Sequence, residues 1–127
     1  MIDTKTFEPM ENRWQDIFKF LQSAGYKVYS PGTKLGECTF EYIVVKFDGS
    51  TKLAGYSTND DLYQLLCFVP KQRYSTFDSF VQRVRNSMRA LEPMIMPYDF
   101  GISNYYDDEI KAYYATLGYK NHKKIRR

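Results

Sequence analysis

The chain has 127 residues, of which 43% are hydrophobic and 17% aromatic. That size suits a single domain with its own core, and the apolar content is too high for an intrinsically disordered chain. The net charge of +3, from 18 lysines and arginines against 15 acids, argues against a generally basic nucleic-acid-binding protein.

The first predicted element is a helix over residues 9–24. Four apolar residues lie on one face of it: Trp14, Ile17, Phe18 and Leu21. Gly25 follows the last turn, where a left-handed residue commonly ends a helix. A short strand over residues 26–29 and a turn at Pro31 and Gly32 come next.

Residues 39–47 form the strongest predicted strand. Its centre reads Tyr-Ile-Val-Val, and such a continuous apolar run is typical of an interior strand buried on both faces. We therefore expect Val44→Asp to abolish folding, because the new carboxylate would be buried without a partner.

The segment after this strand predicts a hairpin. Asp48 and Gly49 form a two-residue turn signal, which would lead into a partner strand over residues 52–57. Residues 58–61 are polar and are predicted to form a loop. A further strand over residues 62–69 follows and is ended by a proline.

The second predicted helix covers residues 76–91. Its apolar residues form a single stripe: Phe77, Phe80, Val81, Val84, Met88 and Leu91. Ser75 or Thr76 is expected to cap the first turn with its hydroxyl.

The last third predicts a brief strand over residues 94–96, an irregular loop over residues 97–108 and a final strand over residues 109–119. Two helices that each carry one apolar stripe must bury it against a sheet. The sequence therefore predicts an α+β fold, a mixed and mostly antiparallel sheet with two helices packed on one face, in a single domain over residues 1–119.

Residues 120–127 are predicted to be a basic C-terminal arm. They include five cations and no acid: Lys120, Lys123, Lys124, Arg126 and Arg127. The rest of the chain then holds 13 basic residues against 15 acids, so the body is mildly acidic. The arm has three interpretations, which are phosphate contacts, a reach toward an acidic neighbouring subunit, and simple solvation. Its removal is expected to leave the fold intact and to weaken assembly.

No group of residues predicts catalysis or metal binding. His122 is the only histidine and lies in the basic arm, without orienting partners in the sequence. The acidic residues at 60–61 and 107–109 lack the spacing of a calcium loop, so solvated loop acids are expected. Cys38 and Cys67 lie in apolar runs and are predicted to be buried free thiols.

Residues 53–56 and 113–119 are expected to form edge strands of the sheet. An edge strand exposes backbone groups, which a monomer usually blunts with charges or a bulge. A closed ring would instead use such edges in head-to-tail contacts. The 12 tyrosines fit either half-buried sheet positions or interfaces.

Six segments, taken in order, carry a resemblance to a known family. They read GYKVYSPG (25–32), KLGEC (34–38), YIVVK (42–46), YQLLCFVP (63–70), YSTF (74–77) and LEPMI (91–95). This ordered set resembles the tail terminator, or tail completion, proteins of siphophages that infect Gram-positive bacteria. The resemblance covers about residues 18–127.

The resemblance implies a structural role in the virion, at the head–tail junction. Such proteins form a closed, usually hexameric ring on the last ring of the tail tube, which ends tube polymerisation and makes a docking surface for the head connector or stopper protein. DNA passes through the ring without being read, and no cofactor or enzymatic turnover is implied. Residues 1–10 contain acids and no apolar run, so we expect synthesis in the host cytoplasm, with no signal peptide and no membrane segment.

We expect the assembly contacts of such a ring in polar loops, on the tyrosine-rich strand and in the arm. The candidates are Lys71, Gln72, Arg73, Asp60, Asp61, Tyr113, Tyr119, Lys123, Lys124, Arg126 and Arg127. Polar loops tolerate exposure and often carry recognition, so residues 58–61 and 71–73 are assigned to the two axial faces.

Three other functions stay open from the sequence. Another neck component, a head completion or stopper protein, would share the size and composition of a tail terminator. A small cytoplasmic nucleic-acid-binding module would use the basic arm and would bind in a salt-sensitive way. An enzyme would need a concave pocket with perturbed titratable groups, and no residue in the sequence points to one.

Overall fold

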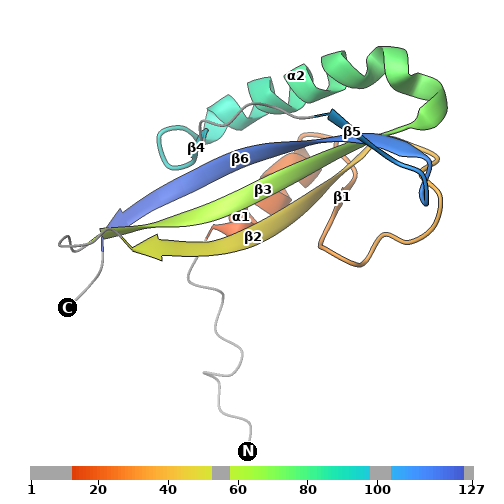
Figure 1. Cartoon of the computed structure of the whole chain (residues 1–127). Helices are drawn as coiled ribbons and strands as arrows, with labels where there is room; N and C mark the ends of the chain where they lie inside the picture. Colours follow the sequence, from red (N-terminus) through yellow and green to blue (C-terminus); the bar gives the residue numbers. More distant parts are fainter. Residues whose placement is uncertain (1–12, 53–57, 98–103, 125–127) are drawn as a thin grey trace, which may run out of the picture.

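A computed structural model of the chain describes residues 13–52, 58–97 and 104–124 (Figure 1). The elements are α1 (Trp14–Ser23), β1 (Val28–Tyr29), β2 (Tyr42–Lys52), β3 (Thr58–Pro70), the 3₁₀ helix η2 (Lys71–Thr76), α2 (Phe77–Met88), the 3₁₀ helix η3 (Arg89–Leu91), β4 (Met96–Pro97), β5 (Asn104–Asp107) and β6 (Ala112–Lys124). The predicted α+β fold is confirmed.

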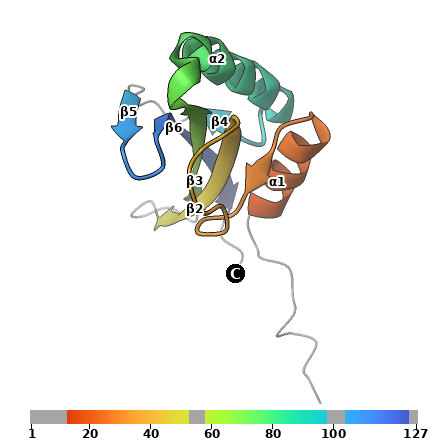
Figure 2. The same cartoon turned by 90° about the vertical axis from the view of Figure 1, so that its right-hand side faces the viewer.

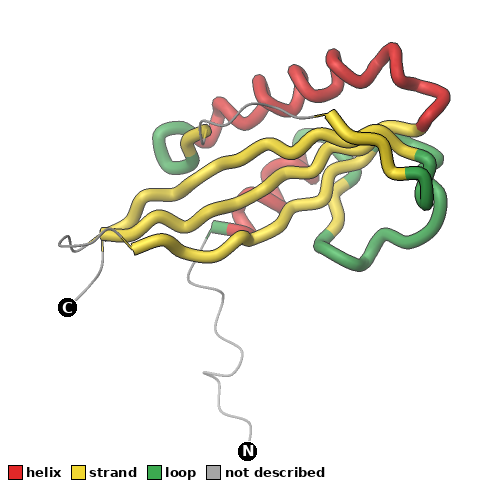
Figure 3. Tube along the Cα trace, in the orientation of Figure 1, coloured by secondary structure: helices red, strands yellow, loops and turns green. Residues whose placement is uncertain are grey.

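The described strands form one mixed sheet in the order β1-β2-β3-β6-β4, and β5 pairs with β6 beside β4. β1 runs parallel to β2, whereas every other pair is antiparallel. β2, β3 and β6 are the long central strands (Figure 3). β3 and β6 pair along 13 residues each, a length of roughly 40 Å for extended chain.

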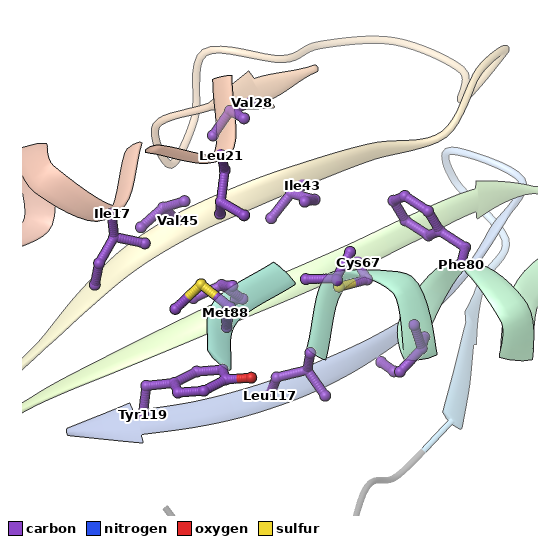
Figure 4. Packing of buried hydrophobic residues seen from close by; sticks show 14 of the residues in the cluster. Ile17, Leu21, Val28, Ile43, Val45, Cys67, Phe80, Met88, Leu117 and Tyr119 are labelled. Carbon is purple, nitrogen blue, oxygen red and sulfur yellow. The ribbon is translucent and has the colours of Figure 1, made fainter. Parts of the chain in front are cut away.

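Both helices pack on the same face of this sheet (Figure 2). Ile17 and Leu21 of α1 lie toward Val45 and the neighbouring part of β2, while Met88 of α2 and Cys67 of β3 belong to the same cluster (Figure 4). All five side chains are essentially buried. The burial of each large apolar side chain stabilises the fold by about 1.5–3 kcal/mol, so the two stripes predicted from the sequence hold the helices in place.

The end of α1 follows the sequence prediction. Gly25 has φ of +100°, the amide of Gly25 donates to the carbonyl of Gln22, and the amide of Tyr26 donates to the carbonyl of Leu21. These two bonds satisfy carbonyls that the last turn leaves open, and only glycine adopts this backbone conformation freely. At the other end the described helix begins at Trp14, and the predicted start at residue 9 lies outside the described residues.

Two local predictions around the hairpin signal are wrong. Asp48 and Gly49 do not make a turn, because β2 continues through them to Lys52 with a β-bulge between Phe47 and Gly49. Gly49 has φ of +102°, a conformation that serves a bulge as well as a hairpin turn. Residues 58–61 are the start of β3 rather than a loop. The predicted strand over 52–57 falls mostly outside the described residues.

β2 is buried less evenly than its apolar run predicted. Ile43 and Val45 point to the helices and are completely buried, whereas Val44 points to the opposite face and is half-buried. On that face it packs with a second, smaller cluster around Tyr42 and Phe68. The strand therefore has a partner on both sides only where β1 pairs with Ile43 and Val44, and only one of its faces lies under a helix in the described part of the chain.

The C-terminal boundary of the domain is also corrected. β6 begins at Ala112 and runs to Lys124, so residues 120–124 belong to the sheet and not to a free arm. The sequence of residues 120–124 did not predict a strand, because these residues are mostly charged or polar. Their pairing with residues 58–62 of β3 depends on the backbone and not on side-chain polarity. The loop predicted over residues 97–108 likewise contains β5. Residues 125–127 lie outside the described part.

Thr76 does not cap α2 as expected. Its hydroxyl donates to the carbonyl of Arg73 at 2.8 Å, inside the 3₁₀ turn that leads into the helix. This turn takes the place of a capped first turn, so the helix proper begins at Phe77. Five residues of the predicted stripe are buried in α2, whereas Leu91 lies in η3 because the helix ends at Met88 and not at residue 91.

Candidate assembly surfaces

A row of aromatic side chains crosses the sheet face that lies opposite the helices. It consists of Tyr105, Tyr114, Phe68, Tyr42 and Tyr29, one from each of β5, β6, β3, β2 and β1. Successive ring centroids lie 5.4, 5.3, 4.9 and 5.5 Å apart. The strand register places Tyr105, Tyr114, Phe68 and Tyr42 side by side on one face. Tyr29 pairs with Val44, and its ring meets that of Tyr42 edge to face. We call these five residues the aromatic row.

The aromatic row is buried in its middle and open at one end. Tyr42 and Phe68 are 3% and 9% exposed, while Tyr105 on the outer strand is 51% exposed. The segment between β1 and β2 packs over Tyr42 and Phe68. The amide of Cys38 in this segment donates a hydrogen bond to the carbonyl of Ile110 at 2.7 Å. An exposed tyrosine ring that continues a packed row offers rigid contact area at low entropic cost.

A second group of tyrosines gathers where β3 passes into η2. The ring of Tyr113 lies 4.4 Å from that of Tyr74 and 4.9 Å from that of Tyr106, and it also approaches Phe77. Tyr74 and Tyr106 are 55% and 39% exposed. Tyr113 was predicted as an edge contact, but it acts through ring packing at this end of the molecule.

The expected edge at residues 113–119 is only partly open. β6 pairs with β3 on one side, and on the other side β5 covers residues 112–115 and β4 covers residues 119–120, so among the described strands only residues 116–118 lack a second partner. Tyr119 is 5% exposed and belongs to the main core, so it is a poor candidate for a surface contact. Burial raises the pKa of Tyr119 to about 12, partly offset by the nearby Arg85. The other expected edge, residues 53–56, lies outside the described residues.

An open edge in the described part of the sheet is residues 46–52 of β2. β1 pairs only with Ile43 and Val44, and the indole N–H of Trp14 then donates to the carbonyl of Val45 at 2.7 Å. Beyond that point the edge carries the Lys46–Asp48 ion pair, at 3.6 Å, and the bulge. Charges and bulges of this kind discourage strand pairing with another chain.

The predicted polar contacts lie at opposite ends of the sheet. Lys71, Gln72 and Arg73 are exposed in η2, directly after the end of β3, and the amide of Lys71 donates to the carbonyl of Lys111. Asp60 and Asp61 lie at the start of β3, roughly 30 Å away along the strand. The structure therefore does not bring these candidates together, and they belong to two separate surfaces.

Asp61 is corrected from a solvated loop acid to a buried residue. It is 0% exposed and lies opposite Asn121, which is 8% exposed, on the face that carries the helices. Asp60, its neighbour, is half-buried and points to the other face. Alternation along a strand sends one acid inward and the next outward, which a loop would not do.

Lys123 and Lys124 lie in β6, opposite Asn59 and Thr58, and Arg126 and Arg127 lie outside the described residues. We therefore expect the deletion of residues 120–127 to destabilise the fold, contrary to the sequence expectation. It would remove the strand partner of residues 58–62 and uncover Asp61. Urea unfolding should show a loss of several kcal/mol, whereas deletion of residues 125–127 alone serves as the control. Equal stability of the longer deletion and the full chain would contradict this pairing.

Two hollows flank α2. The first, with a volume of 520 Å³, lies between α2 and the turn after α1, where Lys27 stands over the ring of Phe40 and Arg83 over that of Phe80, each at 5.4 Å. Arg83 also pairs with Glu41 at 3.2 Å. The second hollow, of 450 Å³, lies between the C-terminal half of α2 and β4, and Arg85 and Arg89 are among the residues that line it.

Both cysteines are buried free thiols, as predicted. Burial raises the pKa of the Cys38 and Cys67 thiols, which keeps both in the unreactive protonated form near neutral pH. In the described part of the chain no three potential metal ligands come together, and the acids at 107–109 form a turn in which the amide of Glu109 donates to a carboxylate oxygen of Asp107. None of the described helices has the length and apolar character to span a membrane.

Sequence reasoning missed several residues that this geometry makes prominent. Tyr105 and Tyr106 were placed in an irregular loop, and Tyr74 was used only as part of a motif. The adjacent tyrosines could have suggested an exposed strand, but their ring contacts depend on β6. Comparisons with protein-family models and with curated proteins gave no match.

Proposed function

We propose that this chain is a structural virion protein that caps a phage tail tube as a closed ring, expected to be a hexamer. In that role it ends tube polymerisation and forms the docking surface for the head connector at the head–tail junction. Its partners are other copies of itself, the major tail tube protein and the connector or stopper protein. It needs no cofactor and performs no enzymatic turnover.

The aromatic row carries this proposal. A sheet whose aromatic face ends in an exposed tyrosine ring has the composition of an interface core, in which tyrosine is enriched. Tyr74 and Tyr106 extend the exposed aromatic surface around the same end of the molecule. A protein whose work is assembly needs such contact area and does not need a catalytic pocket.

The shape of the molecule supports a ring in a second way. A ring closed by rotation requires two different surfaces on each chain, because each copy contacts its neighbours head to tail. Long strands separate η2, with exposed Lys71 and Arg73, from the opposite tip that holds Asp60. These separate ends suit two axial faces, one toward the tube and one toward the connector.

The location of the protein in the particle tests this function. Gold-labelled electron microscopy of the phage that carries the chain should place the label only at the head–tail junction. Label elsewhere, or none on the particle, would overturn the proposal and favour a soluble binding module. A stopper protein would give the same label, and gene order then separates the two, since a terminator gene normally precedes the tail tube gene.

A single substitution tests whether the aromatic row is needed to cap the tail tube. Tail tube protein polymerised with the wild-type chain should give tubes of limited length, as measured by electron microscopy. Tyr105→Asp should reduce this capping at least tenfold, because it places a charge at the exposed end of the row. Ser79→Asp on the exposed side of α2 is the matched control and should cap normally.

A further inference from the structure

The solvent side of α2 carries a ridge of donor side chains. Gln82, Arg85, Asn86 and Arg89 are all exposed and recur at the three- and four-residue spacing of one helix face. They line the 450 Å³ hollow beside β4. We call these four residues the basic ridge.

The arginines of the basic ridge form no ion pair among the described residues. The ion pairs there are Arg13–Asp16, Lys46–Asp48 and Arg83–Glu41, none of which involves Arg85 or Arg89. Glu92 also lines the hollow, so two guanidinium groups stand against one carboxylate. Guanidinium groups beside amide donors suit a carboxylate ligand, which they bind through charge-assisted hydrogen bonds.

The same chain presents carboxylates at another place, the turn between β5 and β6. Asp108 and Glu109 are exposed there, and Asp107 is half-buried. The amide of Glu109 donates to the side chain of Asp107 at 2.9 Å, which leaves Asp108 and Glu109 to face solvent. We call residues 107–109 the acidic turn.

The acidic turn cannot reach the basic ridge of its own chain. It adjoins Ala112, whereas Tyr119 in the wall of the hollow lies seven residues further along β6, roughly 23 Å away. β5 and β4 accordingly lie toward opposite ends of α2 (Figure 1). Two complementary surfaces at opposite ends of one chain match the requirement for head-to-tail association.

We propose that the basic ridge of one copy binds the acidic turn of a neighbouring copy. This inference rests on the proposed ring and names the surfaces that close it. A nucleic-acid backbone would offer the ridge phosphate oxygens, but each copy of this chain already presents exposed carboxylates of complementary charge at its other end. A protein turn can instead offer both carboxylates and backbone carbonyls to the ridge.

Charge reversal on each side provides the test. Arg85→Glu with Arg89→Glu reverses the ridge, and Asp108→Lys with Glu109→Lys reverses the turn. Each double variant should associate with itself at least tenfold more weakly than the wild type in sedimentation velocity. An equal mixture of the two should recover association, because the acidic ridge of one then meets the basic turn of the other and the remaining wild-type pair also matches.

Gln15→Glu with Lys19→Glu and Gln22→Glu is the control, since it changes the net charge by the same amount as the reversed ridge, at exposed positions of α1 away from both surfaces. It should associate like the wild type, and circular dichroism should show all variants folded. Unchanged association in either reversed variant, or no recovery in the mixture, overturns the inference. Loss of duplex DNA binding in the reversed-ridge variant, with association intact, would overturn it in favour of a nucleic-acid surface.

The outcomes for the inference and for the proposed function are separate. If the label lies at the head–tail junction but the mixture does not recover association, the proposed function stands and the contact between the basic ridge and the acidic turn is rejected. Label elsewhere on the particle would reject the tail-terminator function, whatever the mixture does.

Discussion

Val45→Asp is expected to leave no folded protein under conditions where the wild type is native. Val45 is 0% exposed and packs between α1 and the long strands. A carboxylate there would lose its water without gaining a partner, at a cost of several kcal/mol. Domains of this size have a free energy of unfolding of only about 5–15 kcal/mol, so this single change is expected to remove most or all of it.

Val44→Asp, which the sequence alone predicted to abolish folding, is now expected to fold and is the matched control. It makes the same chemical change one residue away on the opposite, half-buried face. Val44 is half-buried and lies under no helix of the described residues, so its carboxylate keeps contact with water. Circular dichroism and urea unfolding of both variants measure the difference. A native, cooperative Val45→Asp protein, or an equal loss of stability in both variants, would contradict this assignment. It would show that Val45 does not point to the helices while Val44 points to the opposite face.

The second large effect is expected at alkaline pH. Burial raises the pKa of Tyr42, Tyr63 and Tyr119 to about 12 in the folded protein, from the ordinary value of 10.0. The neutral phenols therefore stabilise the fold fully below pH 10. That stabilisation falls as the pH rises from 10 and is lost above 12, because the unfolded chain gives up these protons first.

A shift of this size corresponds to about 2–3 kcal/mol for each tyrosine, since one pKa unit is worth about 1.4 kcal/mol. The midpoint of urea unfolding should consequently drop steeply between pH 10 and pH 12. Tyr119→Phe should flatten part of this drop, while Tyr105→Phe, at a half-exposed position, should leave it unchanged. An unfolding midpoint independent of pH over this range would contradict the burial of the three hydroxyls.

The candidate assembly surfaces could be predicted only in part from the sequence. Exposure of Lys71, Gln72 and Arg73 was predicted correctly, because a polar run after a proline commonly leaves the sheet. The inward position of Tyr119 was not predicted, since alternation alone does not say which face of β6 the helices cover. The basic ridge was not predicted from the sequence, because the hollow beside it requires β4.

The sequence alone determined the features that depend on a few neighbouring residues. The apolar stripes of α1 and α2 follow from the helical period, the end of α1 from the left-handed Gly25, and the end of β3 from Pro70. Each of these features depends on local backbone geometry or on the spacing of residues along one element, and both can be read directly from the sequence.

Only the tertiary structure decided the features that depend on a distant partner. Gly49 became a bulge and not a turn because β2 stays paired with β3 beyond it, and Asp61 lies in a strand and not in a loop because β2 and β6 pair with β3 on both sides. Lys120–Lys124 joined the sheet for the same reason. Backbone hydrogen bonds between strands form without regard to side-chain polarity, so a polar run gives no warning that a remote strand will pair with it.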